Sequence, residues 1–249
     1  MPLWLVPGFF ISAAAYATAG FGGGSSYLAL LVLSGMPFES VAVLALLCNI
    51  LVVGGNLLHY RQAGLLSVKP LLPFLVSSVP LAALGGSLPI SEKLFSVLLG
   101  FCLALVGLRL WLGHHGNEQA AISPTVGLRW LIGVPVGGIL GFIAGLVGIG
   151  GGILLAPILY FLRWGSARSI AAHCSLFILI NSLAGLAGHF SNGSVLALPA
   201  AAVWLFAAVV AGGQLGAHGS AFKLPVWMLR RSTAIIVLAA GGRLLWQSL

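Results

Sequence analysis

The sequence has 249 residues, of which 60% are hydrophobic and only 6% are charged, with a mean hydropathy of +1.13 and a formal net charge of +8. Soluble domains carry about 25% charged residues, so a water-facing surface is excluded and an all-α polytopic membrane protein is predicted. The 11 basic residues are scattered singly beside apolar runs, which argues against a nucleic-acid partner and suits membrane topology and an anionic substrate.

The first apolar segment is interrupted by glycines. It comprises residues 3–19 and 25–33, separated by Gly20-Phe21-Gly22-Gly23-Gly24. Glycine inside a helix costs roughly 1 kcal/mol against alanine, so four glycines in five positions predict unwound backbone rather than a bend. Three further apolar runs, each about as long as a membrane span requires, complete the first half at residues 40–58, 70–88 and 94–111.

The same order of segments recurs in the second half. Residues 131–145 and 153–162 flank a second break, Gly148-Ile149-Gly150-Gly151-Gly152, which begins 148 − 20 = 128 residues after the first. Three apolar runs follow at residues 169–188, 198–215 and 229–246. We therefore predict two duplicated transmembrane repeats, 1–113 and 126–249, joined by a polar linker at 114–125. Each repeat has a Gly-broken first helix and five helical segments.

The basic residues favour inverted repeats. Arg61 and Lys69 follow the second apolar run of the first half, whereas Arg163 and Arg168 precede the corresponding run of the second half. Lys and Arg prefer the cytoplasmic side, so the two halves are expected to have opposite orientations. This requires an odd number of crossings per half, which is met if each broken segment turns back at its glycines. A parallel repeat of four spans with a kinked first helix is the alternative.

These features together resemble the TauE/SafE family of sulfite-exporter-like permeases over essentially the whole chain. The second glycine break, followed by Ala156-Pro157, matches that family's G-x-G-G-G-x-x-x-x-P motif. The first break departs from it, with Ser25-Ser26 after the glycines and Ala29 in place of proline. The resemblance implies a carrier of small sulfur-containing anions such as sulfite, thiosulfate or organosulfonates, and leaves the direction of transport open.

The helix that restarts after each break predicts an anion site. Its first N–H groups have no intrahelical partner, and the positive end of its dipole lies at the glycines. An oxyanion can accept those hydrogen bonds without an arginine in the membrane. The alternative is that the glycines only allow close helix packing. The substrate-binding residues predicted at the breaks are Gly23, Gly24, Ser25, Ser26, Gly151 and Gly152.

Polar side chains within the apolar runs complete the predicted site. Such groups are costly in a membrane and usually face a cavity or a polar partner. His59 and His189 each end the second run of their half, and they either contact substrate and couple protons or bond to neighbouring backbone. The further predicted substrate-binding residues are Asn49, Asn181 and Gln214.

The function predicted from the residues and the resemblance is secondary transport of a small sulfur-containing anion, with no catalytic residue, metal or cofactor. The expected location is the bacterial inner membrane, crossed several times, with the lipid bilayer and the anion as partners; a homodimer is left open. One alternative is a membrane-embedded enzyme that uses His and Cys, because His173 and Cys174 are adjacent. A non-transporting membrane subunit is the other.

Inverted repeats make a direct topological prediction. Gly35 and Gly165 each follow a broken segment. Single cysteines introduced at these two positions should nevertheless react with a membrane-impermeant maleimide from opposite sides of the membrane. Labelling of both from the same side would instead support the parallel arrangement.

Overall fold

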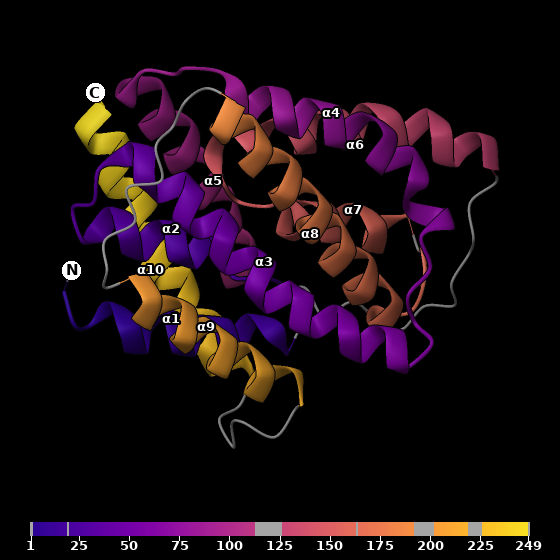
Figure 1. Cartoon of the computed structure of the whole chain (residues 1–249), viewed down its shortest axis with the longest axis horizontal. Coiled ribbons are helices and arrows are strands. Elements are labelled where there is room, and N and C mark those ends of the chain that lie inside the picture. The colour runs from indigo at the N-terminus through magenta and orange to yellow at the C-terminus, as the bar shows by residue number, and fades with distance from the viewer. Residues whose placement is uncertain are drawn as a thin grey trace.

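The computed structural model describes residues 2–18, 20–112, 126–162, 164–191, 202–218 and 226–248. These residues form two sets of five α-helices (Figure 1). The first set is α1 (Leu5–Ala17), α2 (Gly24–Leu33), α3 (Phe38–Gln62), α4 (Leu72–Ser87) and α5 (Glu92–Leu112), with a 3-10 helix, η1 (Lys69–Leu71), before α4. The second set is α6 (Val126–Val147), α7 (Gly152–Phe161), α8 (Ala167–Ser191), α9 (Ala202–Ala217) and α10 (Val226–Ser248).

Three of the five helices have the same length in the two sets. The second helix has 10 residues in both sets, the third 25 and the fourth 16. The all-helical architecture predicted from the sequence is confirmed for the described residues. The linker predicted at 114–125 lies outside them, and the repeat boundaries stay a prediction.

Four of the described helices are long and apolar enough to cross a membrane, judged by length and composition. They cover Ser40–Gln62, Lys69–Ser87, Val126–Val147 and Arg168–Ser191. Shorter apolar helices make up much of the remainder, among them α2, whose residues from Gly24 to Leu31 are all buried. Many large apolar side chains on the outside of the bundle are exposed, as is expected of a surface that faces lipid rather than water.

The first broken segment turns back on itself. Gly23 has a φ of 86°, which is left-handed backbone that favours glycine, and the chain reverses there. The rings of Phe9 on α1 and Tyr27 on α2 are stacked with centroids 4.8 Å apart. A Cβ placed on Gly8 would lie 3.2 Å from Cδ1 of Leu30, so α2 runs back along α1. The second break is also built from left-handed glycines, with φ values of 87°, 78° and 75° at Gly148, Gly150 and Gly151.

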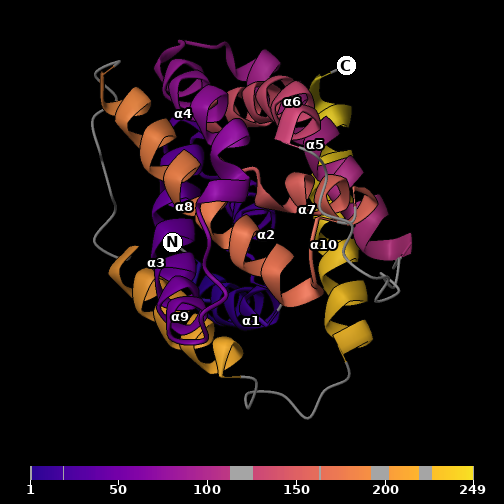
Figure 2. The same cartoon turned by 90° about the vertical axis from the view of Figure 1, so that its right-hand side faces the viewer.

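Helices with the same position in the two sets make corresponding contacts. Helix α1 packs on α9 as α6 packs on α4, α3 packs on α9 as α8 packs on α4, and α2 packs on α3 as α7 packs on α8. Two further pairs, α3 with α8 and α5 with α10, join helices that have the same position in the two sets. Figure 2 shows the short helices α2 and α7 at the centre, surrounded by the pairs α1–α9, α3–α8, α4–α6 and α5–α10.

The pairs of equivalent helices are antiparallel. Near the end of α3, the Tyr60 hydroxyl and Ala171, near the start of α8, both lie within 3 Å of the Cβ position of Gly20. At the other end, the Cβ position of Gly185 lies 3.5 Å from Cδ1 of Leu46, near the start of α3. Early residues of one helix therefore meet late residues of the other.

Glycines bring α4 and α6 into backbone contact. A Cβ would lie 2.7 Å from Cα of Phe74 at Gly137, and 2.5 Å from Cα of Ser78 at Gly141. Spacing of small residues by four positions keeps them on one helix face, which lets two helices approach closely in a membrane.

We expect Gly141→Ala to destabilise the protein by about 1–3 kcal/mol, because the methyl group would overlap the backbone of α4. Gly127→Ala on the same helix is the matched control, since nothing lies within 4 Å of its Cβ position. Thermal unfolding in detergent measures both variants. Equal melting temperatures for the two would show that α4 and α6 are not packed through Gly141.

Candidate functional site at the glycine breaks

The two glycine breaks meet at one small buried cavity. Its volume is about 10 Å³, close to the space that one water molecule needs. The first break contributes its last three glycines and the start of α2, and the second break contributes Ile149 and the start of α7. The lining residues are Tyr16, Phe21, Gly22, Gly23, Gly24, Ser25, Ile149, Ile153 and Ile178.

Both helices that begin at the cavity have uncapped N-termini. Gly23 and Gly151 are the N-cap residues of α2 and α7, and neither makes a side-chain capping hydrogen bond. The first backbone bonds run from Ser26 N to Gly23 O and from Leu154 N to Gly151 O. The amides before them therefore lie in the first helical turn, where no intrahelical acceptor exists.

Asn49 on α3 connects the two breaks. Its side chain is fully buried, and Nδ2 donates to the carbonyl oxygen of Ile149 at 3.4 Å. A Cβ on Gly24 would lie 2.6 Å from Nδ2, and one on Gly150 would lie 2.9 Å from it. The Asn49 Oδ1 atom has no hydrogen-bond partner among the described residues. Asn49 therefore lies beside both breaks, and its role in substrate binding stays a prediction.

The hydroxyl groups of Tyr16 and Ser25 line the cavity, and that of Ser26 contacts Tyr16. The Tyr16 hydroxyl lies 3.3 Å from Oγ of Ser25 and accepts a hydrogen bond of 3.3 Å from Oγ of Ser26. Hydroxyl hydrogen bonds usually measure 2.7–2.8 Å, so these contacts are long and leave the three groups able to reorient. All three side chains are buried.

The opposite side of the cavity is apolar. Ile149, Ile153 and Ile178 line it, and all three are buried. Asn49 is residue 49 − 38 + 1 = 12 of α3, and Ile178 is residue 178 − 167 + 1 = 12 of α8. The same position therefore carries an amide on α3 and a hydrocarbon on α8. The site is polar mainly toward the first break.

The predicted residues of the second break face α8 more than the cavity. A Cβ on Gly152 would lie 3.0 Å from the carbonyl oxygen of Cys174, and one on Gly151 would lie 2.9 Å from Cε1 of Phe177. Asn181 is buried, and its Nδ2 donates to the carbonyl oxygen of Phe177 one turn earlier at 2.9 Å. Gly151, Gly152 and Asn181 do not line the cavity, and the N-terminal turn of α7 reaches it through Ile153.

The two predicted histidines and Gln214 do not line the cavity, although His189 contacts α6 one turn before the second break. His59 Nε2 is 3.3 Å from Oε1 of Gln214, and its ring makes an edge contact with His218 at 4.5 Å between centroids. His189 Nε2 donates to the carbonyl oxygen of Gly145 at 3.1 Å. His59 is ten residues after Asn49, about 15 Å along a helix. Because α3 and α8 are antiparallel, the two histidines lie toward opposite ends of the bundle.

Several residues that line the cavity are not predicted from the sequence. Tyr16 lies four residues before the first break, inside the apolar part of the first helix. Ile149 and Ile178 have the sequence pattern of ordinary core residues, and the carbonyl oxygen of Ile149 belongs to the backbone. Ser182 on α8 lies near the second break, with its Oγ 3.2 Å from the Cβ position of Gly150, but it does not line the cavity.

Ser175 supports the first break from α8. Its Oγ donates a hydrogen bond to the carbonyl oxygen of Gly20, and the side chain is fully buried. Among the described residues, no group of three or more His, Cys, Asp or Glu side chains could hold a metal ion, and the three cysteines are buried and form no disulfide.

Ser175→Ala should lower stability by about 1 kcal/mol, because it leaves the buried Gly20 carbonyl without its donor. Ser182→Ala is the matched control: it is also fully buried on α8, but its hydroxyl has no partner among the described residues. Thermal unfolding of the two variants compares them. A smaller loss for Ser175→Ala than for Ser182→Ala would contradict this support of the break.

Comparisons with known proteins agree on one family. The family description "Sulfite exporter TauE/SafE" matches residues 5–244. The chain is 32% identical over 241 residues to the probable membrane transporter protein y4hK of Sinorhizobium fredii, covering 96% of each protein. It is 26% identical over 213 residues to the probable membrane transporter protein YunE of Bacillus subtilis, covering 77% of this chain and 75% of that protein. No solved structure matches.

Proposed function

The chain belongs to the sulfite exporter TauE/SafE family of membrane transporters, and from that premise we propose that it is a secondary carrier of a small sulfur-containing anion. The candidate substrates are sulfite, thiosulfate and organosulfonates. The observation that carries the proposal is the meeting of two uncapped helix N-termini at one buried cavity.

The electrostatics of this cavity favour a negative charge. Each helix N-terminus contributes the equivalent of about half a positive elementary charge, and low-dielectric surroundings screen it poorly. The hydroxyl groups of Tyr16, Ser25 and Ser26 can donate further hydrogen bonds to anion oxygens. Neither a carboxylate nor a basic side chain lines the cavity among the described residues, so the backbone amides and hydroxyls carry the recognition.

Binding requires the cavity to enlarge. Its volume of about 10 Å³ suits one water molecule, and an anion with three oxygens around sulfur needs more room. The side chains of Ile149, Ile153 and Ile178 form the apolar wall and are the groups whose displacement would create it. The conformation described here therefore corresponds to a closed site between the two faces of the membrane.

Inverted repeats would supply the two access states. A two-fold axis that relates two antiparallel helices is perpendicular to both. The packed pairs α3 with α8 and α5 with α10 are antiparallel in this way. For helices that cross the membrane, that axis lies in the membrane plane, which is the symmetry of inverted-repeat carriers. We propose a multi-pass protein of the bacterial inner membrane in which one repeat rocks against the other around the breaks.

Anion binding by the purified protein tests the proposal. We expect isothermal titration in detergent to detect at least one ligand among sulfite, thiosulfate, taurine and sulfoacetate, with the ligand recovered chemically unchanged. Gly24→Ala should abolish this binding, because its methyl group would lie 2.6 Å from Asn49 Nδ2 and 2.7 Å from the Ile149 oxygen, inside the site. Uptake of the same anion by proteoliposomes would establish transport.

Two further variants keep the test decisive. Gly54→Ala on α3 is the control, since nothing lies within 4 Å of its Cβ position, and it should bind as the native protein does. Ser25→Ala removes one cavity hydroxyl without adding volume, so it should weaken binding several-fold even if Gly24→Ala folds poorly. Native affinity in both Gly24→Ala and Ser25→Ala would place the site elsewhere, and turnover of the anion would favour an enzyme.

A further inference from the structure

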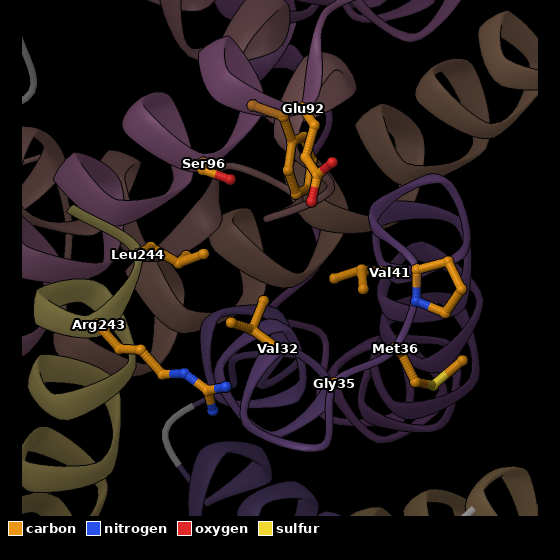
Figure 3. Close-up of a pocket in the computed structure, with 10 residues that line it drawn as sticks. Val32, Gly35, Met36, Val41, Glu92, Ser96, Arg243 and Leu244 are labelled. Atoms are coloured by element: carbon orange, nitrogen blue, oxygen red, sulfur yellow. The ribbon is translucent and has the colours of Figure 1, made fainter. Parts of the chain in front are cut away.

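A second and larger cavity opens at the other end of α2, away from the glycine break. Its volume is about 370 Å³, within the range of small-molecule pockets. It lies between the turn that follows α2, the first turns of α5 and the last turns of α10 (Figure 3). The ten residues of α2 separate it from the break by about 15 Å.

The walls of this cavity carry one acid and one base. Glu92 comes from α5 and Arg243 from α10, and both line the cavity. Figure 3 shows the carboxylate and the guanidinium directed into the space from different sides, with the Ser96 hydroxyl also facing it. Among the described residues neither charged group forms an ion pair, so both charges remain available to a ligand.

The Arg243 side chain contacts the C-terminal end of α2. Arg243 Nη1 donates to the carbonyl oxygen of Leu33, the last residue of α2, at 3.4 Å. This end of a helix carries partial negative charge, which favours a cation beside it. A guanidinium has five N–H donors, so the contact with Leu33 leaves most of them for an incoming oxyanion.

We propose that this cavity binds a zwitterion, with its ammonium group near Glu92 and a phosphate or sulfonate group near Arg243 and Ser96. A ligand with only one charge would leave the opposite charge of the wall unmatched. The apolar side chains of Val32 and Leu244, which Figure 3 shows between the two charged groups, also line the cavity and suit a short carbon linker. A zwitterion is therefore the class of ligand that satisfies all parts of the cavity.

The ligand chemistry has two sources, a free aminoalkyl oxyanion or the headgroup of an ethanolamine phospholipid. Trp246 lies three residues after Arg243 and is 81% exposed, which is typical of an aromatic side chain at the level of lipid headgroups. A headgroup could enter the cavity at that level while its chains lie against the exposed apolar faces of α5 and α10, which include Leu94, Phe101 and Ile235.

The test uses one soluble and one lipid probe. Calorimetric titration with O-phosphoethanolamine should give clearly tighter binding than inorganic phosphate or ethanolamine alone, if the source is soluble. In nanodiscs, phosphatidylethanolamine should raise the melting temperature relative to phosphatidylglycerol, if the source is a lipid. Either response supports the proposal and identifies the source.

Charge-removing variants assign the response to this cavity. Glu92→Gln and Arg243→Gln should each weaken O-phosphoethanolamine binding roughly tenfold, or remove the lipid-dependent shift, because each deletes one charge-assisted contact. Lys93→Gln and Arg61→Gln are controls, since both are exposed and neither lines the cavity, and they should leave the response unchanged.

Three results would overturn the zwitterion site. The first is no response to either probe. The second is phosphate binding as tight as that of O-phosphoethanolamine, which would make the cavity a simple anion site. The third is a response that survives in both Glu92→Gln and Arg243→Gln. Because every readout is equilibrium binding or stability, a failure of sulfur-anion transport would not affect these outcomes.

Discussion

Unwound backbone deep inside the bundle must find hydrogen-bond partners within the protein, and the structure supplies donors for one carbonyl group in each break. Helix ends and left-handed turns expose carbonyl and amide groups that lipid cannot satisfy. Ser175 on α8 donates to the carbonyl of Gly20 in the first break, and Asn49 on α3 donates to the carbonyl of Ile149 in the second. Each break is thus supported by the long helix of the opposite set, which explains why α3 and α8 cross beside both.

The glycine-rich faces of the helices also make corresponding contacts in the two sets. Gly137 and Gly141 on α6 approach the backbone of α4, while Gly212 and Gly216 on α9 approach that of α1, where Cβ atoms would lie 3.1 and 2.9 Å from the carbonyl carbons of Phe10 and Ala14. These close approaches leave little freedom for a helix to slide alone. Movement that opens the central cavity is therefore expected to involve packed groups of helices rather than single helices.

The sequence predicted the parts of the structure that depend on local chemistry. Repeated glycines at Gly20–Gly24 and Gly148–Gly152 cannot remain in a regular helix. Both breaks and the approximate helix boundaries could therefore be predicted from the local sequence. Asn49 was predicted as a site residue because an amide is costly in an apolar run, and it lies beside both breaks. Side chains contributed by distant elements could not be assigned in the same way. Tyr16 and Ile178 look like ordinary core residues, and His59 and Gln214 pair with each other instead of joining the cavity.

The pairing of α1 with α9 also has a consequence for biosynthesis. Ala17 ends α1 and Ala202 begins α9, so 202 − 17 = 185 residues must be added after Ala17 before α9 begins to emerge. At about 5–20 residues per second, this takes on the order of 10 to 40 s. Throughout that interval the small-residue face of α1 lacks its partner, and the nascent first half must be held by lipid, the insertion machinery or a chaperone. The final packing of α1 against α9 is therefore a late event that follows membrane insertion.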